Sequence, residues 1–447
     1  MLQRLNKFRA EYTKVKDALP FLDCYISDMA PGWDDVNKTI PTDYRKFSFE
    51  SGNPRLVMQT KHTFEEIEAM AKAEPEVNFI IASGDQKMLY HYNEITRLIR
   101  DYQNIYVATA NVCNVCFIEE KVSEGLTGKL LYGTMAPYLD PGQALGPLVL
   151  AAISWEEKCA IAGNNLRKLL GEEAVVPAEV ATPVIPQIII DAHSHTADEN
   201  TSRRFPFSHV AEIWSDWEEK MKFFGADIML MSPSNTIGNV EKFPAHEKRQ
   251  FCEDSNGHIF YFEGYDPRKV EVSLAALEKA LKDPLCIGIK IHPPSHRTDA
   301  DAPEYEKVYE IAARYGKPVM THSWGESYYN PTQIHSTAEK FDKYLTAYPG
   351  AKFCFGHTGG RPNGFGLAAD MINKHPQAMG DLAGDLFHNG FIDHALKDIG
   401  ADRIMFGSDI YWIDPRCMLG MLLHAEISDE DLLKILRLNA EKFYLNR

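Results

Sequence analysis

One pattern constrains the fold of the second part of this chain more than any other feature. Short apolar segments end at a polar residue, as in IIIDAHSHT (188–196), LCIGIKIHP (285–293), KPVMTHS (317–323), KFCFGHTGG (352–360) and RIMFGSDIYW (403–412). An amphipathic pattern, APEYEKVYEIAARYG (302–316), lies between two of them. Strands that alternate with helices predict βαβ units and a parallel sheet. About 260 residues of this pattern fit a (β/α)8 TIM barrel.

The barrel is predicted to begin only after a linker. The stretch GEEAVVPAEVATPVIPQ (171–187) contains three prolines and has no helical period, which is typical of an interdomain segment. We therefore divide the chain into a first module (1–175), a linker (176–186) and a barrel domain (187–447). Of the 16 histidines, only His62 and His91 precede residue 190, so imidazole chemistry is expected in the barrel domain.

The first module resembles a shortened copy of the second. Residues 131–170 align with 404–444, EPEVNFIIASGD (74–85) with 348–359, RLVMQT (55–60) with 317–322 and, more weakly, PFLDCYISD (20–28) with 186–196. The positions that align with the histidines and aspartate of the second part hold Tyr25, Ser27, Thr60, Ser83 and Met135. None of these is a good ligand for a divalent cation. The sequence therefore predicts a degenerate, partial barrel-like α/β module without metal ligands.

The strand ends of the second part hold candidate metal ligands. Alternate residues of a barrel strand point the same way, so His193 and His195 are expected to face the mouth of the barrel, where barrel active sites lie. His322, His357 and Asp409 end or follow other strands. Alone, each has an ordinary explanation, such as a hydrogen-bonded strand-end histidine or a helix cap. The set, in this order, predicts a catalytic site for a divalent metal.

The motifs DAHSH, GIKIHP, VMTHS, FGHTGG, FGSD and LRLNAEKFY together resemble the amidohydrolase superfamily. The most similar branch includes aminocarboxymuconate semialdehyde decarboxylase, aromatic-acid decarboxylases and several lactone hydrolases. The resemblance implies one divalent metal, most often Zn²⁺, with His193, His195, His322 and Asp409 as ligands. It also implies that His357 is a general acid/base, and that Asp409 shares a proton with the metal's water.

Five further residues are candidates for substrate binding. In binuclear members of the superfamily, a lysine on the fourth strand becomes carbamylated and bridges two metals, and Lys290 is the candidate for this position; a substrate-orienting or structural role is preferred here. His292 lies on the same strand face, with a capped strand-end histidine as the equal alternative. Arg361 suits a substrate carboxylate or phosphate, and a solvated loop arginine is the alternative. Tyr411 and Trp412 are expected to wall the pocket, unless they pack in the core.

Three functions follow from this site. The first is a hydrolase whose metal-activated water attacks a lactone, ester or amide of a small acidic molecule. The second is a non-oxidative decarboxylase of a small carboxylic acid that uses the same mononuclear site, and the third is a non-catalytic metal-binding or regulatory protein. Pocket residues rather than the ligands separate these functions. Hydrolysis is preferred because the wider superfamily is mostly hydrolytic. Substrate contacts are also expected in 196–214, from Arg203, Arg204 and Trp214.

Composition excludes several classes of partner. The formal net charge of −16 disfavours nucleic acid, because phosphate binding needs a basic face. No run of 18 apolar residues predicts a membrane span, and MLQRLNKFRAEYTKVKD lacks the apolar region of a secretory signal. The eight scattered cysteines, including the lone Cys113/Cys116 pair, are expected to be structural and suit a reducing cytoplasm. A small-molecule substrate and a homodimer complete these expectations.

Overall fold

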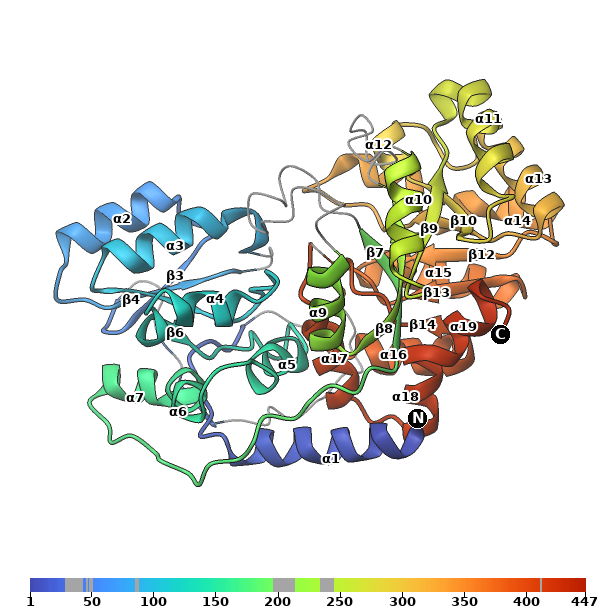
Figure 1. The fold of residues 1–447 in the computed structure, drawn as a ribbon. Helices are drawn as coiled ribbons and strands as arrows, with labels where there is room; N and C mark the ends of the chain where they lie inside the picture. The colour runs from blue at the N-terminus through green and yellow to red at the C-terminus, as the bar shows by residue number, and fades with distance from the viewer. Residues whose placement is uncertain are drawn as a thin grey trace.

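The chain forms a parallel barrel and a smaller α/β unit beside it (Figure 1). The computed structural model describes residues 1–28, 43–45, 47, 51–84, 88–195, 214–233, 245–410 and 412–447. The sequence predictions for Arg203, Arg204 and Tyr411 lie outside these residues, and only the backbone of Trp214 is described. In the described part of the chain, no helix is long and apolar enough to span a membrane.

The barrel consists of eight strands in sequential order, and all neighbouring pairs are parallel. They are β7 (Ile189–His195), β8 (Ala226–Ser232), β9 (Ile259–Gly264), β10 (Cys286–Ile291), β11 (Val319–His322), β12 (Phe353–Gly356), β13 (Ala378–Asp381) and β14 (Ile404–Met405). The segment after β14 closes the ring, because the Asp409 amide donates to His193 O (2.9 Å) and the His195 amide to Ile410 O (2.8 Å). The predicted (β/α)8 TIM barrel is confirmed.

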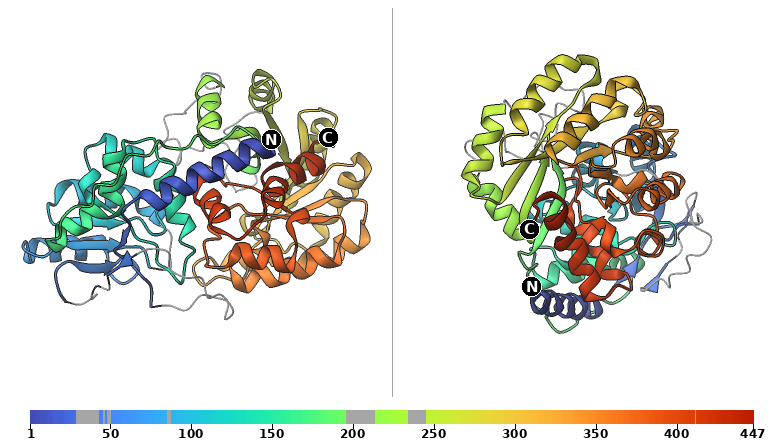
Figure 2. Two further views of the ribbon diagram at one scale, coloured as in Figure 1. Left: turned by 90° about the horizontal axis from the view of Figure 1, so that it is seen from below. Right: turned by 90° about the vertical axis from the view of Figure 1, so that its right-hand side faces the viewer.

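Helices surround this sheet on its outer side (Figures 1 and 2). They include α9 (Trp214–Phe224), α10 (Ala245–Asp254), α11 (Val270–Ala280), α13 (Glu306–Tyr315), α14 (Asp342–Ala347), α15 (Pro362–Lys374), α16 (Phe391–Asp398), α17 (Pro415–His424), α18 (Asp429–Leu433) and α19 (Asn439–Tyr444). The helix predicted at 302–316 is present as α13, preceded by a short 3-10 turn at Pro303. It ends at Gly316, whose φ of +63° suits a residue without a Cβ.

Apolar side chains fill the barrel interior on the side away from the carboxyl ends of the strands. Ile190, Leu230, Phe262 and Met320 belong to one buried cluster, which Tyr444 of α19 covers. The pairing of β7 with β8 is irregular between Asp191 and Ser194. Above this apolar floor, the strand ends open into a cleft that His193 and His195 help to line. The fold therefore separates a stabilising core from a polar mouth, as barrels generally do.

The N-terminal unit contains two small parallel sheets. One has the order β3 (Arg55–Met58), β4 (Phe79–Ala82), β5 (Ile105–Ala108) and β6 (Leu130–Leu131), and the other pairs β1 (Leu22–Asp23) with β2 (Asp43–Tyr44). Its helices are α1 (Leu2–Ala18), α2 (Phe64–Ala73), α3 (Tyr92–Asp101), α4 (Phe117–Ser123), α5 (Gly142–Val149), α6 (Trp155–Cys159) and α7 (Asn165–Leu170). Residues 172–188 form neither helix nor strand. Helix α1 runs along the barrel (Figure 2). There, Arg9 pairs with Asp429 at 2.6 Å.

A buried lysine in the N-terminal unit gives a testable pH dependence. Lys158 is fully buried and donates to Val149 O at 2.6 Å, and burial lowers its pKa to about 7. Between pH 7 and 10 the unfolded chain binds a proton that the folded chain does not, so stability due to this group rises with pH, by about 1 kcal/mol per pH unit. Urea unfolding of Lys158→Met should lack this slope, whereas Lys168→Met, at an exposed position, should keep it; an unchanged slope in Lys158→Met would contradict the assignment.

Candidate active site

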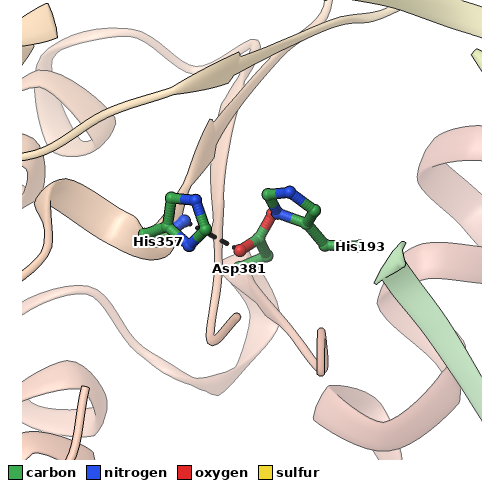
Figure 3. A group of neighbouring side chains, drawn as sticks. All are labelled: His193, His357 and Asp381. Atoms are coloured by element: carbon green, nitrogen blue, oxygen red, sulfur yellow. Dashed lines mark hydrogen bonds and ion pairs between the residues drawn. The ribbon is translucent and has the colours of Figure 1, made fainter. Parts of the chain in front are cut away.

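His193 lies at the centre of a buried polar cluster at the carboxyl ends of the barrel strands. Its Nδ1 is 2.9 Å from Oδ2 of Asp381, which ends β13 (Figure 3). A carboxylate only accepts, so Nδ1 carries the proton and the lone pair of the ring is on Nε2. Lys290 Nζ lies 2.9 Å from this Nε2. A carboxylate behind a histidine in this way orients the ring and makes it a better metal ligand.

Asp381 holds two of the candidate histidines at once. It accepts hydrogen bonds from the amide of His357 (2.8 Å) and from the His193 ring (Figure 3). It also accepts one from the amide of Ala383 (3.1 Å). Burial alone would raise its pKa, but the His193 ring and these hydrogen bonds lower it to about 2. Asp381 is therefore an ionised, fully occupied acceptor that fixes its neighbours, and it was not identified from the sequence.

His195 and Asp409 complete a group of potential metal ligands with His193. The Nε2 atom of His195 is 2.9 Å from Oδ1 of Asp409, and one ligand atom from each of the three residues lies within 4.8 Å of the others. The pKa of Asp409 is well below its usual value, because the contact with His195 outweighs the opposing effect of burial. Two imidazole nitrogens and a carboxylate oxygen fit a divalent cation such as Zn²⁺.

His357 follows β12 and is held as an acceptor. Its Nδ1 lies 2.9 Å from Ala383 O, so this nitrogen donates and Nε2 carries the lone pair. The ring centroid is 4.7 Å from that of His193. Burial, followed by the proximity of the His193 ring, lowers the pKa of His357 to about 4, so the ring is neutral near pH 7. A neutral imidazole with an available lone pair suits general-base chemistry.

His322 lies in the same cluster but is turned to another partner. Its Nε2 is 2.8 Å from Oε1 of Gln333, and its ring centroid is 4.6 Å from that of His357. His292 stacks on His322 with ring centroids 4.4 Å apart. Neither of the metal-ligand groups found among the described residues includes His322. The structure thus brings His193, His195 and Asp409 together. His322 lies next to His357 but outside this group of potential ligands.

A family comparison places this barrel among known proteins. The amidohydrolase family model matches residues 190–445, which is more than half of the chain.

The chain belongs to the amidohydrolase family.

It is an enzyme of this family, and the family together with the His/Asp group indicates a divalent metal site. The family match covers the barrel and leaves the N-terminal unit outside it.

Solved structures with a similar fold cover the same share of the chain. They include a 2,6-dihydroxybenzoate decarboxylase from Rhizobium (15% identity, TM-score 0.44, 58% of this chain and 99% of that chain). A 5-carboxyvanillate decarboxylase from Sphingomonas paucimobilis matches with 12% identity and a TM-score of 0.42, over 57% of this chain and 98% of that chain. A dihydroxybenzoic acid decarboxylase from Polaromonas sp. JS666, solved with bound manganese and an inhibitor, matches with 18% identity and a TM-score of 0.45. The match covers 58% of this chain and 97% of that chain. The comparison with curated proteins gave no match.

The amidohydrolase site opens into a polar cleft of about 790 Å³. Its lining includes Lys290, His292, Arg297, Trp324, Arg361 and Trp412. Arg361 is 3.5 Å from Asp385, and burial lowers the pKa of Lys290 to about 8. The predicted substrate residues that the structure describes therefore all line one cleft. Its three basic side chains favour an anionic group on the substrate.

Several residues of this amidohydrolase site had not been identified from the sequence. Asp381, Gln333 and Asp385 contact His193, His322 and Arg361, and Trp324 stacks near His322 with ring centroids 6.0 Å apart. Asp381 had a usable signal, since it ends a short apolar segment, as the other site residues do. Gln333 and Asp385 lie in loops and carried no such signal.

Proposed function

We propose that the chain is a metal-dependent hydrolase that cleaves a lactone, ester or amide bond in a small acidic molecule. The observation that carries this proposal is the arrangement of His193, His195 and Asp409 beside His357, whose Nε2 is free to accept a proton. Hydrolysis needs a base for the attacking water, and a neutral imidazole next to the ligands supplies one.

The proposed ligands are His193, His195 and Asp409, with His322 as the fourth after it leaves Gln333. One divalent ion is proposed, with Zn²⁺ as the preferred metal, because a set of nitrogen and oxygen ligands with an open coordination position suits it. When bound, such an ion polarises a substrate oxygen and lowers the pKa of a bound water. A second ion bridged by Lys290 is less favoured, because Lys290 Nζ is hydrogen-bonded to His193 Nε2.

The remaining roles belong to side chains of the cleft. His357 accepts a proton at Nε2 from the attacking water and passes it to the leaving group, and Asp409 shares in this transfer. Lys290, His292 and Arg361 orient the substrate. Trp412 and Tyr411 are proposed to form a wall of the pocket. Arg361 is directed by Asp385, so it can present its other nitrogens to a carboxylate.

Non-oxidative decarboxylation is the second candidate. The basic side chains Lys290, Arg297 and Arg361 around the cleft would hold a carboxylate. The loss of CO2 leaves an electron pair on carbon that an acid must protonate. His357 is set as an acceptor rather than a donor, which favours hydrolysis.

The wider context of the enzyme is also proposed. We propose that residues 1–175 form a degenerate amidohydrolase-like module, joined by the linker 176–186 to the catalytic domain 187–447. A reducing cytoplasm is supported by the eight cysteines, all of which are free thiols. A homodimer is the proposed assembly, to be measured by sedimentation.

Metal content tests the proposal. Protein purified without added metal should carry about one divalent ion per chain, and the double variant His193→Ala/His195→Ala should lose it. His357→Gln should keep the ion but lose turnover of a panel of lactones, esters and amides. Release of CO2 from aromatic acids, without ester or lactone cleavage, would favour decarboxylation.

Other outcomes would contradict parts of this function. Two ions per chain would implicate Lys290 as a bridge. No metal after reconstitution would contradict the enzyme site and favour a binding or regulatory protein. Retention of the ion in the double variant would place the metal elsewhere.

A further inference from the structure

The contacts between the N-terminal module and the barrel occur in matched pairs. The amide of Asp140 donates to Phe387 O (2.7 Å), and the amide of Asp414 donates to Cys113 O (2.8 Å). Asp414 follows Asp140 along the chain by the same interval as Phe387 follows Cys113. Each module therefore gives the same donor to the same acceptor of the other, as in a two-fold pair of subunits.

The helices α5 and α17 cross at the centre of this contact. Gly146 and Gly420 are separated along the chain by that same interval. A Cβ on Gly146 would lie 2.0 Å from Arg416 O, and a Cβ on Gly420 would lie 2.2 Å from Gly142 O. The two helices therefore meet backbone to backbone through equivalent positions, which is how a self-complementary interface meets.

Local geometry within the modules matches in the same way. The amide of Thr134 donates to Asp23 (3.2 Å) as the amide of Ser408 donates to Asp191 (3.0 Å). The next residues, Met135 and Asp409, have φ of +59° and +63°. Residues with a Cβ rarely adopt this backbone conformation, so its occurrence at both positions supports a common origin of the two modules.

We propose that the N-terminal module occupies the place of a second barrel in a two-fold pair, and that from there it holds two loops of the active site in position. The first loop, 382–390, follows β13. The second, called loop 409–414, follows β14 and comprises the described residues 409–410 and 412–414. The metal role of these loops rests on the proposed function.

The loop 382–390 links the catalytic histidine to the N-terminal module. At one end, Ala383 O accepts from His357 Nδ1 and Asp385 pairs with Arg361. At the other end, the Asn389 amide donates to Tyr138 O (3.1 Å) and Leu139 pairs with His388 in an antiparallel bridge.

Tyr138 adds side-chain contacts to this bridge. Its hydroxyl is 3.2 Å from His388 Nε2, and the two rings meet edge-on at 5.0 Å. We assign Tyr138 as a positioning residue, since its contacts reach His357 and Arg361 through the loop.

The loop 409–414 begins at a proposed metal ligand and ends at Asp414, which contacts the N-terminal module. Asp409 O accepts from the amides of Trp412 (2.8 Å) and Ile413 (3.3 Å). Asp414 then accepts from the Cys116 amide at 2.9 Å. The backbone of Asp409 is thus anchored by His193 O, and the end of the loop that follows it is anchored to the N-terminal module through Asp414.

A wedge between the helices tests this inference in the full-length chain. Gly146→Ala places its Cβ against α17 without touching any cleft residue. Its matched control is Gly366→Ala in α15, where a Cβ would meet nothing within 4 Å. Hydrogen exchange followed by mass spectrometry should show loops 382–390 and 409–414 exchanging about tenfold faster in Gly146→Ala and unchanged in Gly366→Ala.

Cobalt binding gives the second readout. The affinity of Gly146→Ala for Co²⁺ should fall about fivefold or more, with an altered visible spectrum of the bound ion. A merely structural contact would not change this spectrum. If wild-type protein binds no Co²⁺, the proposed metal function fails, while the exchange measurement still decides the positioning role.

Tyrosine variants provide a second route if Gly146→Ala does not fold. Tyr138→Ala should speed exchange in 382–390, and Tyr138→Phe, which keeps the ring, should restore most of the protection. Tyr102→Phe removes a hydroxyl that bonds Glu68 inside the N-terminal module, and it should leave both loops unchanged. Wild-type exchange in both loops of folded Gly146→Ala or Tyr138→Ala would overturn the inference.

Discussion

Replacement of Asp381 with asparagine is expected to weaken divalent-metal binding by about 10- to 100-fold. One Asp381 oxygen accepts from two amides, those of His357 and Ala383, so the amide oxygen of an asparagine must take that side. Its NH2 group then faces His193 Nδ1, which has to become an acceptor. The ring proton moves to Nε2, and the lone pair that would bind the metal is lost.

Chelator competition would measure this effect. The matched control is Asp342→Asn, which alters another Asp–His pair, 2.7 Å from His375 Nε2 and remote from the cleft. The control should keep wild-type metal affinity. Wild-type affinity in folded Asp381→Asn would show that the tautomer of His193 does not determine binding.

Replacement of Arg416 with methionine is expected to destabilise the protein by about 3–5 kcal/mol. Arg416 is buried in α17 and pairs with Asp414 (2.7 Å) and with Glu119 of α4 in the N-terminal module. Its removal leaves two carboxylates with little access to water and no counter-charge. This arginine also lies over the Phe224 ring, at 5.6 Å, so packing is lost as well.

Urea unfolding would measure the loss. The half-exposed Arg249, which pairs with Asp283, provides the control, because Arg249→Ala should cost about 0–1 kcal/mol. The double variant Arg416→Met/Glu119→Met should recover part of the stability, since it removes one of the stranded charges. A loss below about 1 kcal/mol in Arg416→Met would mean that water reaches the carboxylates.

The order of the barrel strands and the polar residues at their ends follow from the sequence, because both depend on local patterns. The spacing of two between His193 and His195 determines that they share a face, whatever surrounds them. Asp381 follows the same pattern, but its role depends on His193, which is far away in the chain. The turn of His322 toward Gln333 is likewise a tertiary contact that no spacing reveals.

The N-terminal module shows a different limit. Its proposed similarity to the barrel domain is inferred from aligned residues such as Gly133 and Gly407. Alignment does not tell which surfaces meet, because the contact of α5 with α17 depends on the absence of side chains at Gly146 and Gly420. From the sequence alone, glycines at these positions are equally compatible with an exposed turn. The packed structure shows that they allow the close approach of α5 and α17.

The contact between α5 and α17 also has a consequence for synthesis of the chain on the ribosome. All residues of α5, which begins at Gly142, are buried, partly against a helix that begins only at Pro415. At roughly 5–20 residues per second, α5 leaves the ribosome about 15–55 s before α17 exists. During that interval the growing N-terminal module exposes an apolar helix to the cell, and a chaperone would have its best opportunity to bind there.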